Sequence, residues 1–450
     1  MSRSLLAVLV GTFTLRVSTS LTGTLLVYYF ADLPNLGGPT VGALAVGLFA
    51  AAFFATELIF STPFGVLSDR WGHHRVMQIG PIFGITAAIL TYLTTHFFLA
   101  GLVALGYLIV LATRVLEGGS GAASVPSILG YIAQVTSDDE LLRGRASARF
   151  EGATVAGLGV GVVVAGPLYA GIHVTAGPGI DIAGLGPVAF LANAVIYVVS
   201  FFIYRNGVDD PRADDRAPVG GERNSLARYR EVLFSSHVWL LAPTWIALNA
   251  AIGIWSSQSL FQLVKAPDPR FMDQWLMGRV DPVQVSLGLA FGLVLLFAGL
   301  VFWGERFKRM RRTTIILYGI VGGTAIAIAA LAINHSGDWP AALRLIPGVV
   351  VMAGVFVLAG ATPAALGLLA DISERHPDDR GAIMGLYSVF LGLGQIIGSL
   401  IGGVAADVRG IDGIIVGTLL LLAIALVPLA RLRRFEHVVQ GGPEGQVELA

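Results

Sequence analysis

Cysteine is absent from this chain of 450 residues, and charged residues are scarce. Without cysteine the chain can form no disulfide framework, no thiolate zinc site and no iron–sulfur cluster. Its 29 basic residues equal its 29 acidic residues, so we expect no cationic field for nucleic acid. Charged residues make up 13% of the chain, whereas a soluble domain typically has about 25%. So little polar surface predicts that lipid, rather than water, solvates the chain.

Apolar residues make up 55% of the chain, and they occur in long runs. A bilayer core needs about 20 apolar residues per helix. The runs between helix breakers predict an all-α membrane protein with twelve transmembrane helices. Their approximate ranges are 5–30, 41–67, 76–95, 101–134, 146–170, 187–205, 237–262, 284–303, 313–334, 341–370, 382–406 and 412–430. The fourth and tenth runs exceed one crossing and contain Pro126 and Pro363, so we expect them to tilt or to extend into water.

Lys and Arg are distributed unevenly among the predicted loops. An even number of spans places both termini on one side of the membrane. The loops on that side hold 22 of the 29 Lys and Arg residues, and the opposite loops hold 4. Because basic residues are enriched in cytoplasmic loops, we expect a multi-pass protein of the plasma (inner) membrane with both termini in the cytoplasm.

The longest inner loop divides the chain into two halves. Its segment from Asp209 to Arg216 is hydrophilic and is interrupted by Pro211, as is typical of a linker. We therefore predict an N-terminal six-helix bundle over residues 1–205, a cytoplasmic linker over 206–236, a C-terminal six-helix bundle over 237–434 and a cytoplasmic tail over 435–450.

The two halves look like repeats of one unit. Gly166 and Gly398 are 232 residues apart, and the same offset relates Gly171 to Gly403. The Arg-Gly pairs that precede these two spans are 237 residues apart. Offsets near half the chain are what duplication of a six-helix unit would leave.

The loop between the second and third spans combines glycines, one acid and several bases from Gly65 to Arg75. Gly72 allows a tight turn. Asp69, at a helix end, needs a cation or a helix N-terminus as its partner. Arg70 and Arg75 are suited to bind phosphate headgroups or a neighbouring carboxylate. Taken alone, this pattern is equally typical of a basic turn in any polytopic protein.

Beside twelve spans and a half-chain repeat, the loop resembles the signature of the major facilitator superfamily, Gly-x-x-x-Asp-Arg-x-Gly followed by basic residues. The segment Arg114–Gly121 is similar to that family's fourth-span motif of arginine and glycines, and a degenerate copy of the loop begins at Gly304. The resemblance covers residues 5–434. It implies the major facilitator fold, in which two pseudo-symmetric six-helix bundles rock about a substrate site at mid-membrane. It also implies that Gly65, Asp69, Arg70, Gly72 and Arg75 form a conformational-switch loop.

Two departures from the family pattern stand out. His73 and His74 occupy positions where the family usually has basic residues, so this loop is expected to be weaker or sensitive to pH. The glycines of the fifth and eleventh spans partly match the motif of the family's proton antiporters, with Ala170 and Ser399 as mismatches. The hinge candidates that this match implies are Gly166, Pro167, Gly171, Gly398, Gly402 and Gly403. Close helix packing accounts for the same glycines.

Ionisable side chains within the spans point to function, because each costs at least about 2.5–3.5 kcal/mol at the bilayer centre. Glu57 precedes Asp69 by 12 residues, roughly 18 Å along a helix, which places it near the midplane. Arg114 and Glu117 share a helix face and are expected to pair. The candidate proton-coupling residues are Glu57, Glu117 and Glu151. A static lattice of Arg and Glu that orients the helices is the alternative.

Other polar and aromatic side chains in the spans are candidates for a substrate cavity. Arg16 lies on a polar stripe of the first span, where it can face the substrate or pair with an acid. Trp245 and Asn249 lie four residues apart, and this mixture of aromatic ring and amide suits a neutral or amphiphilic ligand. The full set of cavity candidates is Arg16, Arg114, Trp245, Asn249, Gln258, Gln284 and Gln395.

These features predict a secondary active transporter that works by alternating access, with proton-coupled export of amphiphilic or drug-like compounds as the leading reading. The alternatives are a proton symporter or uniporter for a sugar, organic anion or lipid-like substrate, and a non-transporting membrane sensor or scaffold. The sequence has no phosphate-binding loop for ATP, so the proton gradient is the expected energy source. We expect no enzymatic activity, no cofactor and no metal site. The expected partners are a small-molecule substrate and membrane lipid, with the protein acting as a monomer.

Overall fold

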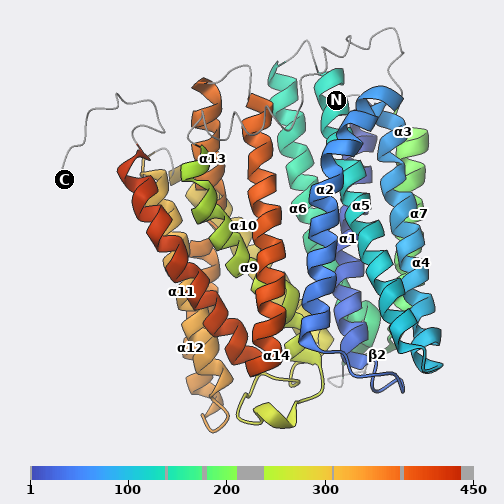
Figure 1. Cartoon of the computed structure of the whole chain (residues 1–450), viewed down its shortest axis with the longest axis vertical. Coiled ribbons are helices and arrows are strands. Elements are labelled where there is room, and N and C mark those ends of the chain that lie inside the picture. Colours follow the sequence, from blue (N-terminus) through green and yellow to red (C-terminus); the bar gives the residue numbers. More distant parts are fainter. Residues whose placement is uncertain are drawn as a thin grey trace. The chain divides into compact units, whose positions relative to one another are not determined.

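The computed structural model describes residues 3–136, 140–174, 180–209, 238–306, 309–375 and 380–436, and most of them are helical (Figure 1). The chain divides into two compact units. Unit 1 consists of Met1–Gly220, Leu263–Ala266 and Val280–Ala290. Unit 2 consists of Gly221–Gln262, Pro267–Arg279 and Phe291–Ala450.

Unit 1 is built around two groups of packed helices. Its helices are α1 (Arg3–Asp32), α2 (Ala43–Trp71), the short α3 (His73–Met77), α4 (Ile79–Leu99), α5 (Val103–Val135), α6 (Glu140–Ala170) and α7 (Ala189–Gly207). Helix α1 packs against α6 and α7, and α5 packs against α2 and α4. A core of buried apolar and aromatic side chains joins the two groups, with Leu5, Met77, Ile128, Tyr197 and Tyr204 among its members.

Unit 2 contains the remaining long helices. They are α9 (Ala242–Val264), α10 (Pro282–Arg306, whose first residues belong to unit 1), α11 (Arg312–Asn334), α12 (Ala341–Leu358), α13 (Ala361–Arg375) and α14 (Arg380–Arg434). Two short 3₁₀ helices, η3 (Val238–Leu240) and η4 (Pro269–Phe271), precede α9 and α10. Helix α11 packs against α12, α13 and α14.

Large apolar side chains stay exposed along the long helices. On α10, Leu287, Phe291, Val294 and Val301 are each more than half exposed, and their spacing places them on one helix face. Such a stripe is stable in lipid but not in water. Within the described residues, ten helical stretches are long and apolar enough to cross a membrane. The prediction of an all-α membrane protein is therefore confirmed.

The predicted number of twelve spans stays a prediction. The ten stretches leave out α9, and they treat Leu386–Arg434 as one stretch of 49 residues. The predicted tenth span, 341–370, is not one helix, because α12 ends at Leu358 and α13 begins at Ala361. Pro363 lies in the first turn of α13, where its missing N–H group breaks no helical hydrogen bond.

A small β-hairpin follows α6, and the all-α prediction missed it. Strand β1 (Gly171–Val174) pairs antiparallel with β2 (Ile180–Ala183), with Gly171 opposite Ala183. The 3₁₀ helix η1 (Gly186–Val188) then leads into α7. Gly171 has a φ of 88°, a conformation that favours glycine, and it marks the end of α6.

Helix α14 contains a break that the side chain of Gln274 bridges. A continuous helix of 55 residues would be roughly 80 Å long, far longer than the hydrocarbon core is thick. The break lies at Arg409 and at Gly410, which has a φ of 58° and a ψ of −136°. The Gln274 amide nitrogen donates to the Arg409 carbonyl at 2.8 Å, and its oxygen accepts from the Ile411 N–H at 2.8 Å. One side chain thus satisfies both backbone groups that the break leaves open.

Replacement of Gly410 should destabilise this break. A β-carbon there would lie 2.5 Å from Met277 Cε and 2.6 Å from Gln274 Oε1, in a conformation that L-residues rarely adopt. We expect Gly410→Ala to cost about 1–3 kcal/mol and to lower the thermal unfolding midpoint of the detergent-purified protein. Gly292→Ala on α10, where a β-carbon would have no neighbour within 4 Å, is the matched control. An equal midpoint in both variants would contradict this account of the break.

Candidate functional site

Helices α1 and α6 of unit 1 approach each other through glycines. A β-carbon on Gly157 would lie 2.6 Å from the Phe13 carbonyl oxygen, and one on Gly161 would lie 2.4 Å from the Val17 carbonyl oxygen. Carbon and oxygen do not come so close without displacement, so only glycine permits this spacing. In lipid such close backbone contact replaces the hydrophobic effect as the force that holds helices together.

Helices α9 and α14 of unit 2 meet in the same way. A β-carbon on Gly394 would lie 2.7 Å from the Ile246 carbonyl oxygen, and one on Gly398 would lie 2.1 Å from the Ala250 carbonyl oxygen. Gly402 continues the contact one turn further along α14, against Ile254. The expectation that these glycines allow close helix packing is confirmed for Gly398 and Gly402, whereas their role as hinges stays a prediction.

The two sets of contacts correct the repeat offset inferred from the glycines. Gly157 and Gly161 occupy the places of Gly394 and Gly398, an offset of 237 residues. That offset equals the one between the Arg-Gly pairs, whereas the 232-residue offset equates positions with different partners. Gly166 contacts the start of α10: its N–H donates to Ser286 Oγ at 3.1 Å. Glycine spacing alone could not show which helix each glycine faces.

The expected pairing of Arg114 with Glu117 is confirmed. Arg114 Nη2 lies 2.8 Å from Glu117 Oε2, and both side chains are almost fully buried. Thr22 of α1 and Tyr197 of α7 lie beside this pair. The ion pair therefore lies where three helices of unit 1 meet, away from water.

A buried amide, Asn193 of α7, belongs to the same polar cluster, and the sequence analysis missed it. Its side-chain nitrogen donates to the Ser18 carbonyl at 3.0 Å and to Thr22 Oγ1 at 2.6 Å. These bonds tie α7 to α1 beside the ion pair. The available signal was a lone asparagine in an otherwise apolar span, because a polar side chain there needs a partner.

Glu57 of α2 lies in a space that a glycine of α5 provides. A β-carbon on Gly121 would lie 2.6 Å from Glu57 Oε1, and one on Gly118 would lie 2.4 Å from the Phe53 carbonyl oxygen. The fourth-span glycine motif thus brings α2 close to α5 and leaves room for the Glu57 carboxylate. Arg16 of α1 interacts electrostatically with Glu57, and both side chains are partly exposed.

The structure places the other proton-coupling candidate and one cavity candidate on exposed surface. Glu151 is exposed on α6. Gln284 is exposed at the start of α10, where its side-chain oxygen accepts a hydrogen bond from the Asp281 N–H at 3.3 Å. Gln284 therefore acts as a helix cap in this structure, and its predicted contact with substrate stays a prediction.

Polar and aromatic side chains gather on α9 and α14 of unit 2. The ring of Trp245 stacks on that of Tyr387, with 5.3 Å between ring centroids and 30° between planes. Asn249 donates to the Trp245 carbonyl at 2.8 Å, and Gln395 accepts from Ser256 Oγ at 3.0 Å. Of the cavity candidates, Trp245, Asn249, Gln258 and Gln395 all lie on these two helices and are buried.

Some of these buried groups lack hydrogen-bond partners within the described part of the chain. They include the Trp245 indole nitrogen and both polar atoms of the Gln262 amide. Buried polar groups are normally satisfied by protein, water or ligand, because leaving one unpaired costs about 1–3 kcal/mol. A stacked indole with an open N–H and a nearby free amide is chemically suited to bind an aromatic compound that carries hydrogen-bonding groups.

The predicted switch loop joins α2 to α3. Gly72 ends α2 with a φ of 98°, which confirms the tight turn. Asp69, Arg70 and Arg75 are exposed. The nearby histidines are both engaged: His73 contacts the Ser68 hydroxyl, and His74 Nε2 lies 3.2 Å from the Tyr204 carbonyl oxygen. The loop is thereby fastened to the end of α7.

Comparison with known proteins places this arrangement among transporters. A family model described as Major Facilitator Superfamily matches residues 8–355 and 271–448. The chain is 21% identical over 414 residues to quinolone resistance protein NorA of Staphylococcus aureus (strain MSSA476), covering 91% of each protein. It is 22% identical over 385 residues to multidrug resistance protein 2 of Bacillus subtilis (strain 168), covering 84% of this chain and 83% of that protein.

Solved structures share the fold. The nucleoside transporter NupG superposes with a TM-score of 0.69 at 13% identity, covering 96% of this chain and 98% of that one. A D-xylose-proton symporter superposes with a TM-score of 0.64 at 14% identity, covering 99% of each chain. The fold expected from the sequence is therefore confirmed.

The buried ion pair yields a test that separates a structural role from a functional one. Glu117→Gln should leave Arg114 as an uncompensated buried charge and cost about 3–5 kcal/mol of stability. Removal of both charges, with Arg114→Gln added, should restore most of the thermal midpoint measured in detergent. Transport by this double variant then decides the role: restored transport means that the pair only holds the helices. A double variant as unstable as Glu117→Gln would contradict the pairing argument.

Proposed function

The chain belongs to the major facilitator superfamily, and from that membership we propose that it exports amphiphilic, drug-like compounds in exchange for protons. The protein is a multi-pass membrane transporter of this family. We further propose that it acts as a monomer in the plasma (inner) membrane and moves its substrate without altering it chemically. The proton gradient would be its energy source, with no cofactor.

The observation that carries the proposal is the setting of Glu57. Its carboxylate occupies the space left by Gly121 and has Arg16 as its electrostatic partner. An acid inside a membrane helix is costly unless it serves a purpose. Protonation of Glu57 would remove its attraction to Arg16 and so weaken the link between α2 and α1. A change in protonation would thereby become a change in helix contacts.

The substrate class rests on the polar and aromatic groups of α9 and α14. Trp245 offers a stacking face and an open N–H, and Gln262 offers an unpaired amide. These groups suit planar, partly apolar molecules better than sugars, which need a denser array of polar partners. The names of two relatives, a quinolone resistance protein and a multidrug resistance protein, favour the same class.

Proton coupling is tested by removing the Glu57 charge. In proteoliposomes with an imposed pH gradient, the wild type should move ethidium, an amphiphilic aromatic cation, at a rate that depends on the gradient. Glu57→Gln should abolish gradient-driven flux while the protein still inserts, because the amide cannot exchange a proton. Glu57→Asp, which keeps the carboxyl group, should retain part of the flux.

Glu151→Gln is the comparison variant, since Glu151 is exposed on α6. We expect it to transport normally. Full gradient-driven flux in Glu57→Gln would remove Glu57 from the mechanism. Flux of the wild type that ignores the gradient would refute antiport altogether and favour a uniporter.

The proposed orientation is open to a direct test, because the chain has no native cysteine. A single cysteine at Ser225, in the predicted linker, should react with a membrane-impermeant maleimide only after the cells are permeabilised. A single cysteine at Met272, an exposed residue between α9 and α10, should react in intact cells. The reverse pattern would place the termini outside.

A further inference from the structure

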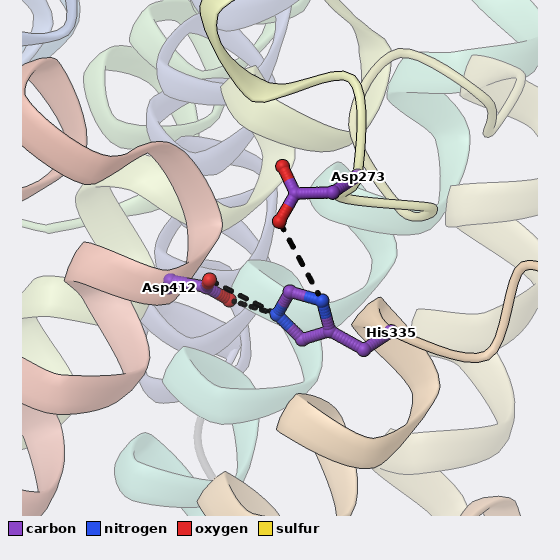
Figure 2. A group of neighbouring side chains, drawn as sticks. All are labelled: Asp273, His335 and Asp412. Carbon is purple, nitrogen blue, oxygen red and sulfur yellow. Dashed lines mark hydrogen bonds and ion pairs between the residues drawn. The ribbon is translucent and has the colours of Figure 1, made fainter.

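Three ligand-type side chains converge in unit 2, far from one another in the sequence. Asp273 lies between η4 and α10, His335 follows the last residue of α11, and Asp412 lies just after the break in α14. Figure 2 shows the imidazole between the two carboxylates. His335 Nε2 is 3.0 Å from each Asp412 oxygen, and Nδ1 is 3.8 Å from Asp273 Oδ2.

Two buried amides hold this cluster in place. Asn334 donates from its side-chain nitrogen to Asp412 Oδ1 at 2.8 Å and accepts from the Leu276 N–H at 3.2 Å. Gln274 ties the same loop to the break in α14. Asp412 is therefore oriented by a second layer of hydrogen bonds, and the loop that carries Asp273 is fixed on both sides. Metal ligands in proteins are commonly oriented in this way.

The charge of the cluster is not balanced within the protein. Among the described residues, no Lys or Arg forms an ion pair with Asp273 or Asp412, whose one shared partner is His335. Nearby Asp268 differs, because Arg270 Nη2 lies 2.8 Å from its Oδ2. That contact raises the pKa of the Arg270 guanidinium above its usual value. With a neutral imidazole, the cluster carries two negative charges that a divalent cation would balance.

We propose that Asp273, His335 and Asp412 bind a divalent transition-metal ion of the zinc type. One ligand atom from each residue lies within 4.8 Å of the others. Ligand atoms bound to one zinc ion at about 2.0–2.2 Å lie roughly 3–3.5 Å apart. His335 Nε2 and Asp412 already have this spacing. The Asp273 side chain is 71% exposed, so it can turn toward the ion without disturbing the core.

The donor set predicts which ions bind. Imidazole nitrogen with carboxylate oxygens suits Zn²⁺, Co²⁺ and Ni²⁺, whereas Mg²⁺ and Ca²⁺ prefer oxygen ligands alone. Three protein ligands leave the remaining positions to water, because the site is partly exposed. A bound ion would join the α9–α10 loop, the end of α11 and the second segment of α14. It should therefore stabilise unit 2.

The proposal is tested on full-length, tag-free protein in detergent, since a polyhistidine tag would itself bind these ions. Zn²⁺ should raise the thermal unfolding midpoint in a saturable manner, and Mg²⁺ at the same concentrations should not. Co²⁺ should produce a visible absorption band that Zn²⁺ displaces. His335→Gln and Asp412→Asn should lose both responses, and Asp273→Asn should weaken Zn²⁺ binding about tenfold or more.

Controls keep each outcome informative. Asp268→Asn, which alters the acid paired with Arg270, should bind Zn²⁺ as the wild type does. Because Asp412 accepts a structural hydrogen bond from Asn334, Asp412→Asn is open to misfolding, and the exposed Asp273→Asn then decides. Absence of binding to the wild type at millimolar Zn²⁺ would overturn the proposal. An unchanged Zn²⁺ response in His335→Gln would overturn it too. A midpoint that depends on pH but not on metal would instead make His335 a proton-controlled latch.

Discussion

Close backbone contact at glycines is the constraint on which both units depend. In lipid, apolar side chains gain nothing by leaving the solvent for each other, so helices associate through contact and hydrogen bonding. Gly157 and Gly161 let α6 rest directly on carbonyl oxygens of α1, and Gly394 and Gly398 do the same for α14 on α9. The apolar side chains that would fill a soluble core remain exposed on α10 and elsewhere, where lipid covers them.

The same close packing determines where polar groups are tolerated. Glycines of α5 bring α2 near enough for Glu57 to lie in the space beside Gly121. The Arg114–Glu117 pair is sealed between helices and shares its surroundings with Asn193 and Thr22. In unit 2, the backbone contacts bring Trp245, Asn249 and Gln395 onto one pair of helices. Charge is thus concentrated in one unit, and neutral hydrogen-bonding groups in the other, as a proton-coupled carrier of amphiphiles would require.

Local patterns in the sequence predicted local structure well. Three-residue spacing predicted the Arg114–Glu117 pair, Gly72 predicted the turn after α2, and long apolar runs predicted the membrane helices. Contacts between distant segments were not predictable in this way. Asp412 is 77 residues from His335, and no short motif joins them, so the sequence analysis expected no metal ligands there. Gln274 was missed for the same reason, since its partners lie across the break in α14.

The matched crossings of α1 with α6 and of α9 with α14 give Arg16 a counterpart in Asn249. A β-carbon on Gly157 would lie 2.8 Å from Arg16 Cβ, and one on Gly394 would lie 2.5 Å from Asn249 Cβ. A shift at the first crossing displaces a cation, whereas a shift at the second displaces an uncharged amide. An elementary charge moved across the whole membrane exchanges about 2.3 kcal/mol per 100 mV with the electrical potential. Of these two crossings, only that of α1 with α6 is therefore sensitive to voltage.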